Sequence, residues 1–155
     1  MRTPAIAATL CIALLHTTGA SAAPLPDGGV TAPEVARVLQ SKGFQAEVTT
    51  DKRGEPLVQS SSGGAKFGVY FYECKGQRCS SIQFSSGFSG TGITAAKIAE
   101  WNRTKRFGRA YQDDEKDPWV EMDVDVEHGA NTDALANDLD RWIAVMGEFM
   151  RYIGR

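Results

Sequence analysis

Two cysteines, Cys74 and Cys79, are the first residues in this sequence whose spacing suggests chemistry. They end two runs rich in Phe, Tyr and Ile on either side of the polar residues 75–78. Such runs around a four-residue loop with a glycine predict a β-hairpin. The Cα atoms of facing residues in a hairpin lie about 4.5–5.5 Å apart, a separation that a disulfide can bridge. Redox dithiols usually have C-x-x-C spacing, and a zinc site needs two further ligands. The spacing favours a structural disulfide, with redox and metal roles as alternatives.

A row of carboxylates is the second candidate. The predicted strand 119–127 alternates, with Val120, Met122, Val124 and Val126 on one face and Glu121, Asp123, Asp125 and Glu127 on the other. The acidic row could bind a cation or a basic partner segment. The alternative, which we favour, is an outer face exposed to solvent. Arg106 or Arg109 of the preceding strand would then pair with its carboxylates.

No pattern for catalysis accompanies these acids. The acidic segment 113–117 lacks the glycine and the ligand spacing of an EF-hand loop. His128 is the one histidine beyond the N-terminal segment and falls in a predicted turn, and no G-x-S-x-G elbow occurs. We therefore expect a protein that is not an enzyme and that holds neither a metal nor a cofactor.

The N-terminal segment predicts export. Arg2 precedes an apolar run at 5–15, and an A-x-A cleavage site ends at Ala22. The run is shorter than the roughly 20 apolar residues that a membrane span requires. We expect a Sec-type signal peptide over 1–22, cleavage after Ala22, and a periplasmic or secreted protein in an oxidising compartment where disulfides persist.

The rest of the chain reads as one domain. No later segment could insert stably in a membrane, so we expect a flexible leader over 23–30 and a single domain over 31–155. Without Arg2, the 17 basic residues fall to 16 against 19 acidic ones, a formal net charge of −3. This mild negative charge argues against binding to nucleic acid.

Local patterns predict the order helix, four strands, helix, two strands, helix. The helices are expected over 33–42, 95–105 and 133–152, and the strands over 44–50, 55–61, both arms of the hairpin within 66–84, 107–112 and 119–127. Thr31 and Glu34 match a capping box before the first helix. The last helix carries an apolar stripe through Leu139 and Trp142 at helical spacing. These elements predict a small sheet onto which the helices pack.

The Gly/Ser-rich loop 85–92 carries one aromatic residue, Phe88. An exposed Phe88 could form the lip of a binding site. The alternative, which we favour, is that Phe88 packs under its own loop.

The sequence resembles the YbjN family of proposed bacterial sensory transduction regulators over about 31–153. The resemblance rests on D-x-x-G-E-P-L-V at 51–58, the strand 67–72 with its two cysteines, C-S-S-I-Q-F at 79–84, W-N-R at 101–103 with R-F at 106–107 and A-Y at 110–111, and the alternating strand after Trp119. It implies an α+β domain similar to type III secretion chaperones, with three helices and an antiparallel sheet of five to six strands. Such a fold binds protein segments, and the resemblance implies no catalytic residue. The signal peptide would make this chain an exported member.

The candidate binding and family-motif residues are Phe88, Trp101, Asn102, Arg106, Arg109, Tyr111 and Trp119. We expect Trp101 to pack on the sheet and Asn102 to fix the turn from helix to strand. Arg106, Arg109 and Tyr111 are expected to meet the acids of the last strand, and a structural role is favoured for each.

The sequence thus predicts a non-enzymatic, exported binding module that engages a protein or peptide as a regulator or chaperone-like factor. The alternative is an envelope protein that binds a small ligand between the sheet and the last helix. Analogy with the chaperone-like fold adds a homodimer as an expectation.

Overall fold

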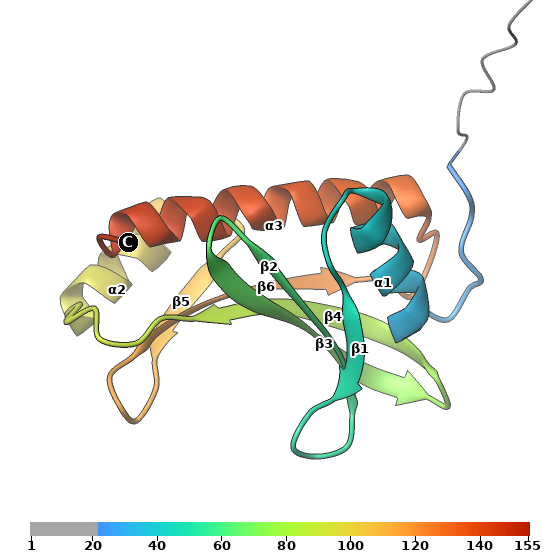
Figure 1. Ribbon diagram of the computed structural model, residues 1–155, viewed down its shortest axis with the longest axis horizontal. Helices are drawn as coiled ribbons and strands as arrows, with labels where there is room; N and C mark the ends of the chain where they lie inside the picture. Colours follow the sequence, from blue (N-terminus) through green and yellow to red (C-terminus); the bar gives the residue numbers. More distant parts are fainter. Residues whose placement is uncertain (1–21) are drawn as a thin grey trace, which may run out of the picture.

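The computed structural model describes residues 22–155, which form three helices and six strands (Figure 1). In chain order they are α1 (Ala32–Ser41), β1 (Glu47–Thr50), β2 (Pro56–Ser62), β3 (Ala65–Lys75), β4 (Arg78–Gly87), α2 (Ala95–Thr104), β5 (Arg109–Gln112), β6 (Pro118–Asp125) and α3 (Thr132–Tyr152). This order confirms the predicted α+β fold, while its likeness to type III secretion chaperones stays a prediction. The predicted signal peptide falls on residues outside the described part, apart from Ala22. Within residues 22–155, none of the helices is both long enough and apolar enough for a membrane span.

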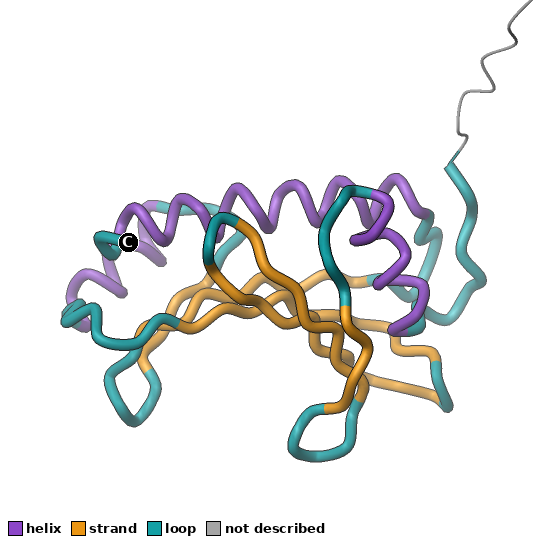
Figure 2. The backbone as a smooth tube through the Cα atoms, in the orientation of Figure 1, coloured by secondary structure: helices purple, strands orange, loops and turns teal. Residues whose placement is uncertain are grey.

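The strands form one antiparallel sheet in the order β1-β2-β3-β4-β6-β5. All three helices lie on one side of the sheet, and the β1–β2 and β5–β6 turns project from the other side (Figure 1, Figure 2). Side chains alternate along each strand, so every second one points away from the helices. We call this side, which none of the helices in residues 22–155 covers, the open face.

The core lies between α3 and the sheet. Trp142 of α3 is fully buried, stacked on Phe84 of β4 at 5.7 Å between ring centroids and edge-on to Phe67 of β3 at 6.0 Å. Phe149 is also fully buried, and its ring centroid lies 4.9 Å from that of Trp101 of α2. Burying a large apolar side chain contributes roughly 1.5–3 kcal/mol. The stripe predicted from the sequence is therefore the main apolar surface that holds the helices on the sheet.

The predicted capping box begins α1. The Glu34 backbone N–H donates to the Thr31 hydroxyl at 3.4 Å, and the Thr31 backbone N–H donates to the Glu34 carboxylate at 2.8 Å. Arg78 of the hairpin donates to the same carboxylate at 3.3 Å. Burial raises the pKa of Glu34, but the hydrogen bonds from Thr31 and Arg78 outweigh it and hold the pKa below its usual value. The cap thus also ties α1 to the hairpin.

Residues 23–30, which the composition predicts to be flexible, follow an extended course beside the β6–α3 connection. The Leu25 backbone N–H donates to the C=O of Ala130 at 3.0 Å. Val30 exchanges two backbone hydrogen bonds with Cys79, at 2.9 and 3.0 Å. The sequence does not reveal this course because the partners lie far along the chain.

The β3–β4 hairpin turns on a shorter loop than predicted. Only Gly76 and Gln77 form it, because the residues on either side are already paired. Gly76 has a φ of 66°, a conformation that favours glycine. This register places Cys74 directly opposite Cys79, and the structure joins them by a disulfide.

Two strands begin later than predicted. Phe44 donates its backbone N–H to the C=O of Leu39 at 3.0 Å, so it completes the end of α1, and β1 starts at Glu47. Phe107 has a φ of 70°, outside the β region, so β5 starts at Arg109.

Replacing both Cys74 and Cys79 by alanine should lower the free energy of unfolding by roughly 2 kcal/mol, because the disulfide restricts the unfolded chain. Urea unfolding of the wild-type protein and the double variant measures the difference. Reductant should destabilise the wild type by a similar amount and leave the variant unchanged. Two free thiols in protein recovered from an oxidising compartment without reductant would contradict the disulfide.

Candidate functional site

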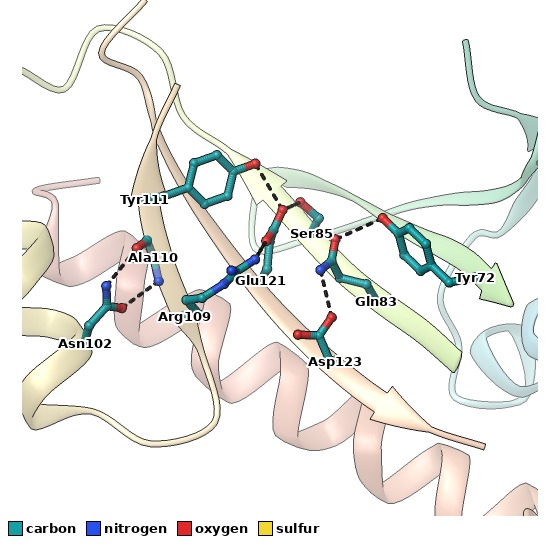
Figure 3. Close-up of polar contacts among 9 residues, drawn as sticks. All are labelled: Tyr72, Gln83, Ser85, Asn102, Arg109, Ala110, Tyr111, Glu121 and Asp123. Atoms are coloured by element: carbon teal, nitrogen blue, oxygen red, sulfur yellow. Dashed lines mark hydrogen bonds and ion pairs between the residues drawn. The ribbon is translucent and has the colours of Figure 1, made fainter. Parts of the chain in front are cut away.

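Glu121 of β6 is the charged centre of the open face, although only 7% of it is exposed. Its Oε2 accepts a hydrogen bond from Arg109 Nη2 at 2.6 Å, and its Oε1 accepts from the Tyr111 hydroxyl at 3.0 Å (Figure 3). The Ser85 hydroxyl donates to Oε1 at 3.5 Å. Strand order explains the cluster, because Ser85 of β4 and Arg109 of β5 are the cross-strand neighbours of Glu121. The buried carboxylate thus has the cationic partner and donors that it needs.

The predicted carboxylate row is only partly a solvated face. Asp123 and Asp125 are exposed as expected, whereas the neighbours from both adjacent strands cover Glu121. Gln83 of β4 donates its side-chain N–H to Asp123 at 2.8 Å and accepts from the Tyr72 hydroxyl at 3.3 Å (Figure 3). A polar network therefore crosses β6, β4 and β3 beside the Glu121 cluster.

The protonation states of the Glu121 cluster follow from its geometry. Burial, together with the charge of Glu121 and the hydrogen bond to it, raises the pKa of Tyr111 to about 12. The hydrogen bond to Glu121 also raises the pKa of Arg109. At neutral pH Tyr111 is therefore a hydroxyl donor and Arg109 a cation, and both serve the same carboxylate.

Beside this cluster, the open face has a hollow of about 310 Å³. Gly68 of β3 and Gly87 of β4 lie in its floor, and Leu57, Tyr70 and Trp119 stand around it. A Cβ at Gly87 would lie 2.5 Å from the Trp119 ring, and one at Gly68 would lie 2.8 Å from the Tyr70 ring. Because glycine has no Cβ, the Tyr70 and Trp119 rings can lie directly against the backbone of these two residues. We call this site the open-face hollow.

Trp119 is held in place from two sides. Its Nε1–H donates to Asp113 Oδ2 at 2.9 Å, and the Tyr111 ring stacks on it with 6.4 Å between centroids and an interplanar angle of 11°. The hydrogen bond from Trp119 lowers the pKa of Asp113 below its usual value. The aromatic wall of the hollow is thus fixed before any ligand arrives.

The acidic segment 113–117 is a hydrogen-bonded turn. Asp113 Oδ1 accepts from the backbone N–H groups of Glu115 at 3.0 Å and Asp117 at 2.9 Å. Across residues 22–155 no group of His, Cys, Asp and Glu side chains is arranged to hold a metal ion.

Trp101 and Asn102 position β5. Trp101 is 1% exposed, and its Nε1–H donates to the C=O of Gly108 at 2.9 Å. The Asn102 side chain donates to the C=O of Ala110 at 2.9 Å and accepts from its N–H at 2.8 Å (Figure 3). Because β5 is an edge strand, Asn102 pairs backbone groups that would otherwise face outward.

Besides Trp101 and Asn102, two further predicted candidates take no part in the Glu121 cluster or the hollow. Phe88 is only 9% exposed and its ring lies 5.9 Å from Phe149 of α3, so it packs in the core rather than forming a lip. Arg106 does not reach the acids of β6; its guanidinium carbon lies 5.1 Å from the centroid of the Phe107 ring. The positive φ of Phe107 breaks the strand alternation on which that expectation rested.

His128, the candidate base of an enzyme, lies in the β6–α3 turn with 80% of its side chain exposed. Its Nε2 lies 3.8 Å from Glu127. This solvated pair does not assemble a nucleophile, base and orienting group in a cleft.

Sequence reasoning missed the open-face hollow. Gly68 and Gly87 interrupt runs that otherwise read as strands. A glycine inside a strand often marks the close approach of another group, so the two glycines were the available signal. Their alignment with Tyr70 and Trp119 depends on strand pairing that the sequence does not give.

Fold and site together define a small α+β module whose most organised surface is the open face of its sheet. A family model named YbjN, described as "Putative bacterial sensory transduction regulator", matches residues 31–155. The chain therefore belongs to the YbjN family, as its motifs indicate. Comparison with curated proteins found no match.

Replacing Glu121 by glutamine should lower the pKa of Tyr111 from about 12 toward its ordinary value, because the charge is lost while burial remains. Since the folded-state pKa is raised, this tyrosine stabilises the fold fully below pH 10, and the contribution is lost as the pH rises toward 12. Phenolate absorbance measured against pH in the wild type and Glu121→Gln tests the shift. The Tyr111→Phe variant identifies which step belongs to Tyr111, and an identical titration in Glu121→Gln would contradict the coupling.

Proposed function

We propose that this protein is a non-enzymatic regulatory module that is exported and binds an extended segment of another protein across its open face. The observation that carries the proposal is the open-face hollow, an aromatic-walled site on an uncovered sheet. The family description supports the regulatory class, and the binding of a segment is our inference.

The hollow suits one anchoring side chain of a bound segment. Its apolar boundary comes from Leu57, Tyr70 and Trp119, and the glycines of its floor let a ligand approach the backbone closely. An aliphatic or aromatic side chain that displaces water there would supply the apolar burial on which protein recognition depends.

The surface beyond the hollow favours an extended ligand. A second hollow, of about 410 Å³, shares Gln59, Ser60 and Lys66 with the first and continues to Glu47 of β1. The two hollows follow each other across β4, β3, β2 and β1. A segment that crosses the strands could therefore contact both.

The charges of the open face favour a basic segment. Glu121 is already compensated by Arg109 at 2.6 Å. Among the described strand residues that face this side, the exposed carboxylates of Glu47, Asp123 and Asp125 outnumber the one cation besides Arg109, Lys66. Lysine or arginine residues beside the anchor would be attracted to this face and would speed association.

The packing between the sheet and α3 argues against the alternative of a small ligand bound there. Trp142 and Phe149 are fully buried there, and Phe84 is 1% exposed and stacked on Trp142. These rings fill the layer, so a ligand would have to displace the core.

The proposal of export has two supports. The segment 1–22 has the pattern of a signal peptide, with Ala23 as the first residue after cleavage. The Cys74–Cys79 disulfide suits an oxidising compartment.

Photo-crosslinking from the open face tests the proposal in cells. A benzoylphenylalanine placed at Gln59, which is exposed in the hollow, should crosslink a partner protein in the envelope fraction. The same residue at Arg37, exposed on α1, is the matched control and should not. Trp119→Ala should reduce the yield from position 59, because it removes a wall of the hollow.

Mass spectrometry of the crosslinked chain also identifies its N-terminal residue, which should be Ala23. Equal yields from positions 59 and 37, or self-crosslinks alone, would contradict binding of another protein at the open face. A chain that keeps Met1 would contradict export.

A further inference from the structure

Phe107 lies at the centre of a strained turn between α2 and β5. The backbone N–H of Gly108 donates to the C=O of Arg106 at 2.9 Å, and Phe107 between them has a φ of 70°. A γ-turn with positive φ is rare and strained, and a bulky side chain is unusual in that region. The surrounding structure must therefore impose this conformation.

Contacts on both sides of the turn impose it. Lys105 donates its backbone N–H to the C=O of Trp101 at 2.8 Å, and the Trp101 side chain holds the C=O of Gly108 at 2.9 Å. Asn102 hydrogen-bonds to the backbone of Ala110, two residues after Gly108. A Cβ at Gly108 would collide with Val145 of α3, so the turn is pressed against that helix. Phe107 cannot relax unless these contacts break.

The strain is not offset by burial of the ring. Phe107 is 60% exposed, more than the other exposed large apolar side chains, Val48 and Tyr111, among residues 22–155. The guanidinium carbons of Arg106 and of Arg141 on α3 each lie 5.1 Å from its ring centroid. The fold therefore presents an aromatic ring with two cationic side chains beside it at its surface, of which Arg141 is also paired with Asp138 of the same helix.

The same turn is strongly basic in a chain of negative net charge. Residues 101–112 contain four cationic residues and no acid. Lys105 and Arg109 are paired with Glu148 and Glu121. Arg103 and Arg106 form no ion pair with another of residues 22–155.

We propose that Arg106, Phe107 and Arg141, the Phe107 patch, form a second docking site that binds an acidic segment of a protein partner. Guanidinium groups that lie over a ring still have N–H groups to donate, and they bind carboxylates in a bidentate manner. An apolar side chain of the same segment would contact the exposed part of Phe107. This site lies outside the open-face hollow and goes beyond the function proposed for it.

The geometry favours an acidic protein segment over an anionic membrane. A ring that inserts into hydrocarbon would draw with it the guanidinium groups that lie over it, and burying these charges is costly. The net charge of −3 without Arg2 also opposes attraction to an anionic bilayer.

Fluorescence anisotropy with the purified 23–155 chain tests the site. The probe is a short labelled peptide of repeated Glu-Glu-Leu units, and the charge-reversed control is the corresponding Lys-Lys-Leu peptide. The acidic peptide should bind. Any binding of the basic peptide, which the open face is proposed to favour, should be the same in the wild type and in Phe107→Ala. Phe107→Ala, which removes an apolar contact, and the double variant Arg106→Gln/Arg141→Gln, which removes charge-assisted contacts, should each weaken binding about tenfold.

Arg37→Gln removes an exposed arginine from α1 and is the matched control; it should leave the affinity unchanged. Circular dichroism shows whether each variant keeps the fold. The proposal is overturned if the acidic peptide does not bind, if neither patch variant weakens it, or if phosphatidylglycerol vesicles bind through Phe107 while the peptide does not. Because this assay needs no open-face ligand, its outcome is independent of the crosslinking from position 59.

Discussion

The packing of α3 on one side of the sheet is the constraint on which the rest of the structure depends. Trp142 rests on Phe84 and Phe67, which fixes the inward face of β4 and β3. Because side chains alternate, the same contact fixes Tyr70 and Ser85 on the open face. A slip of one residue would exchange the two sets, so the buried rings specify the register of the polar network as well as the core.

Both proposed surfaces depend on this core. Trp101 of α2 contacts Phe149 of α3 and holds the C=O of Gly108. These contacts place the strained turn of Phe107, and they also place β5, whose Arg109 and Tyr111 compensate Glu121. The helices supply Arg141 of the Phe107 patch, whereas the side chains of the open-face hollow come from the strands. The packing of the helices also sets the positions of these strand side chains.

Local patterns in the sequence were enough to predict the elements and their order, and they led to the expectation that Arg109 and Tyr111 meet the acids of β6, but they did not predict the open-face hollow. The stripe around Trp142 and the alternation around Glu121 are periodic signals within single elements. The open-face hollow needs Gly68, Gly87 and Trp119 from three strands, so it depends on register. The burial of Glu121 has the same origin. The turn at Phe107 escaped prediction because an aromatic residue beside a strand pattern favours a β conformation, not a positive φ.

Oxidative footprinting of tryptophan tests the central claim, that the open face is covered by a partner in the cell. Trp101 is 1% exposed and Trp142 is fully buried, so both are internal references that should stay unlabelled. Trp119 is half-buried at the hollow and should be labelled in the purified 23–155 chain. We expect strong protection of Trp119 when labelling is performed in intact cells. Equal labelling of Trp119 in both settings would contradict a partner on the open face.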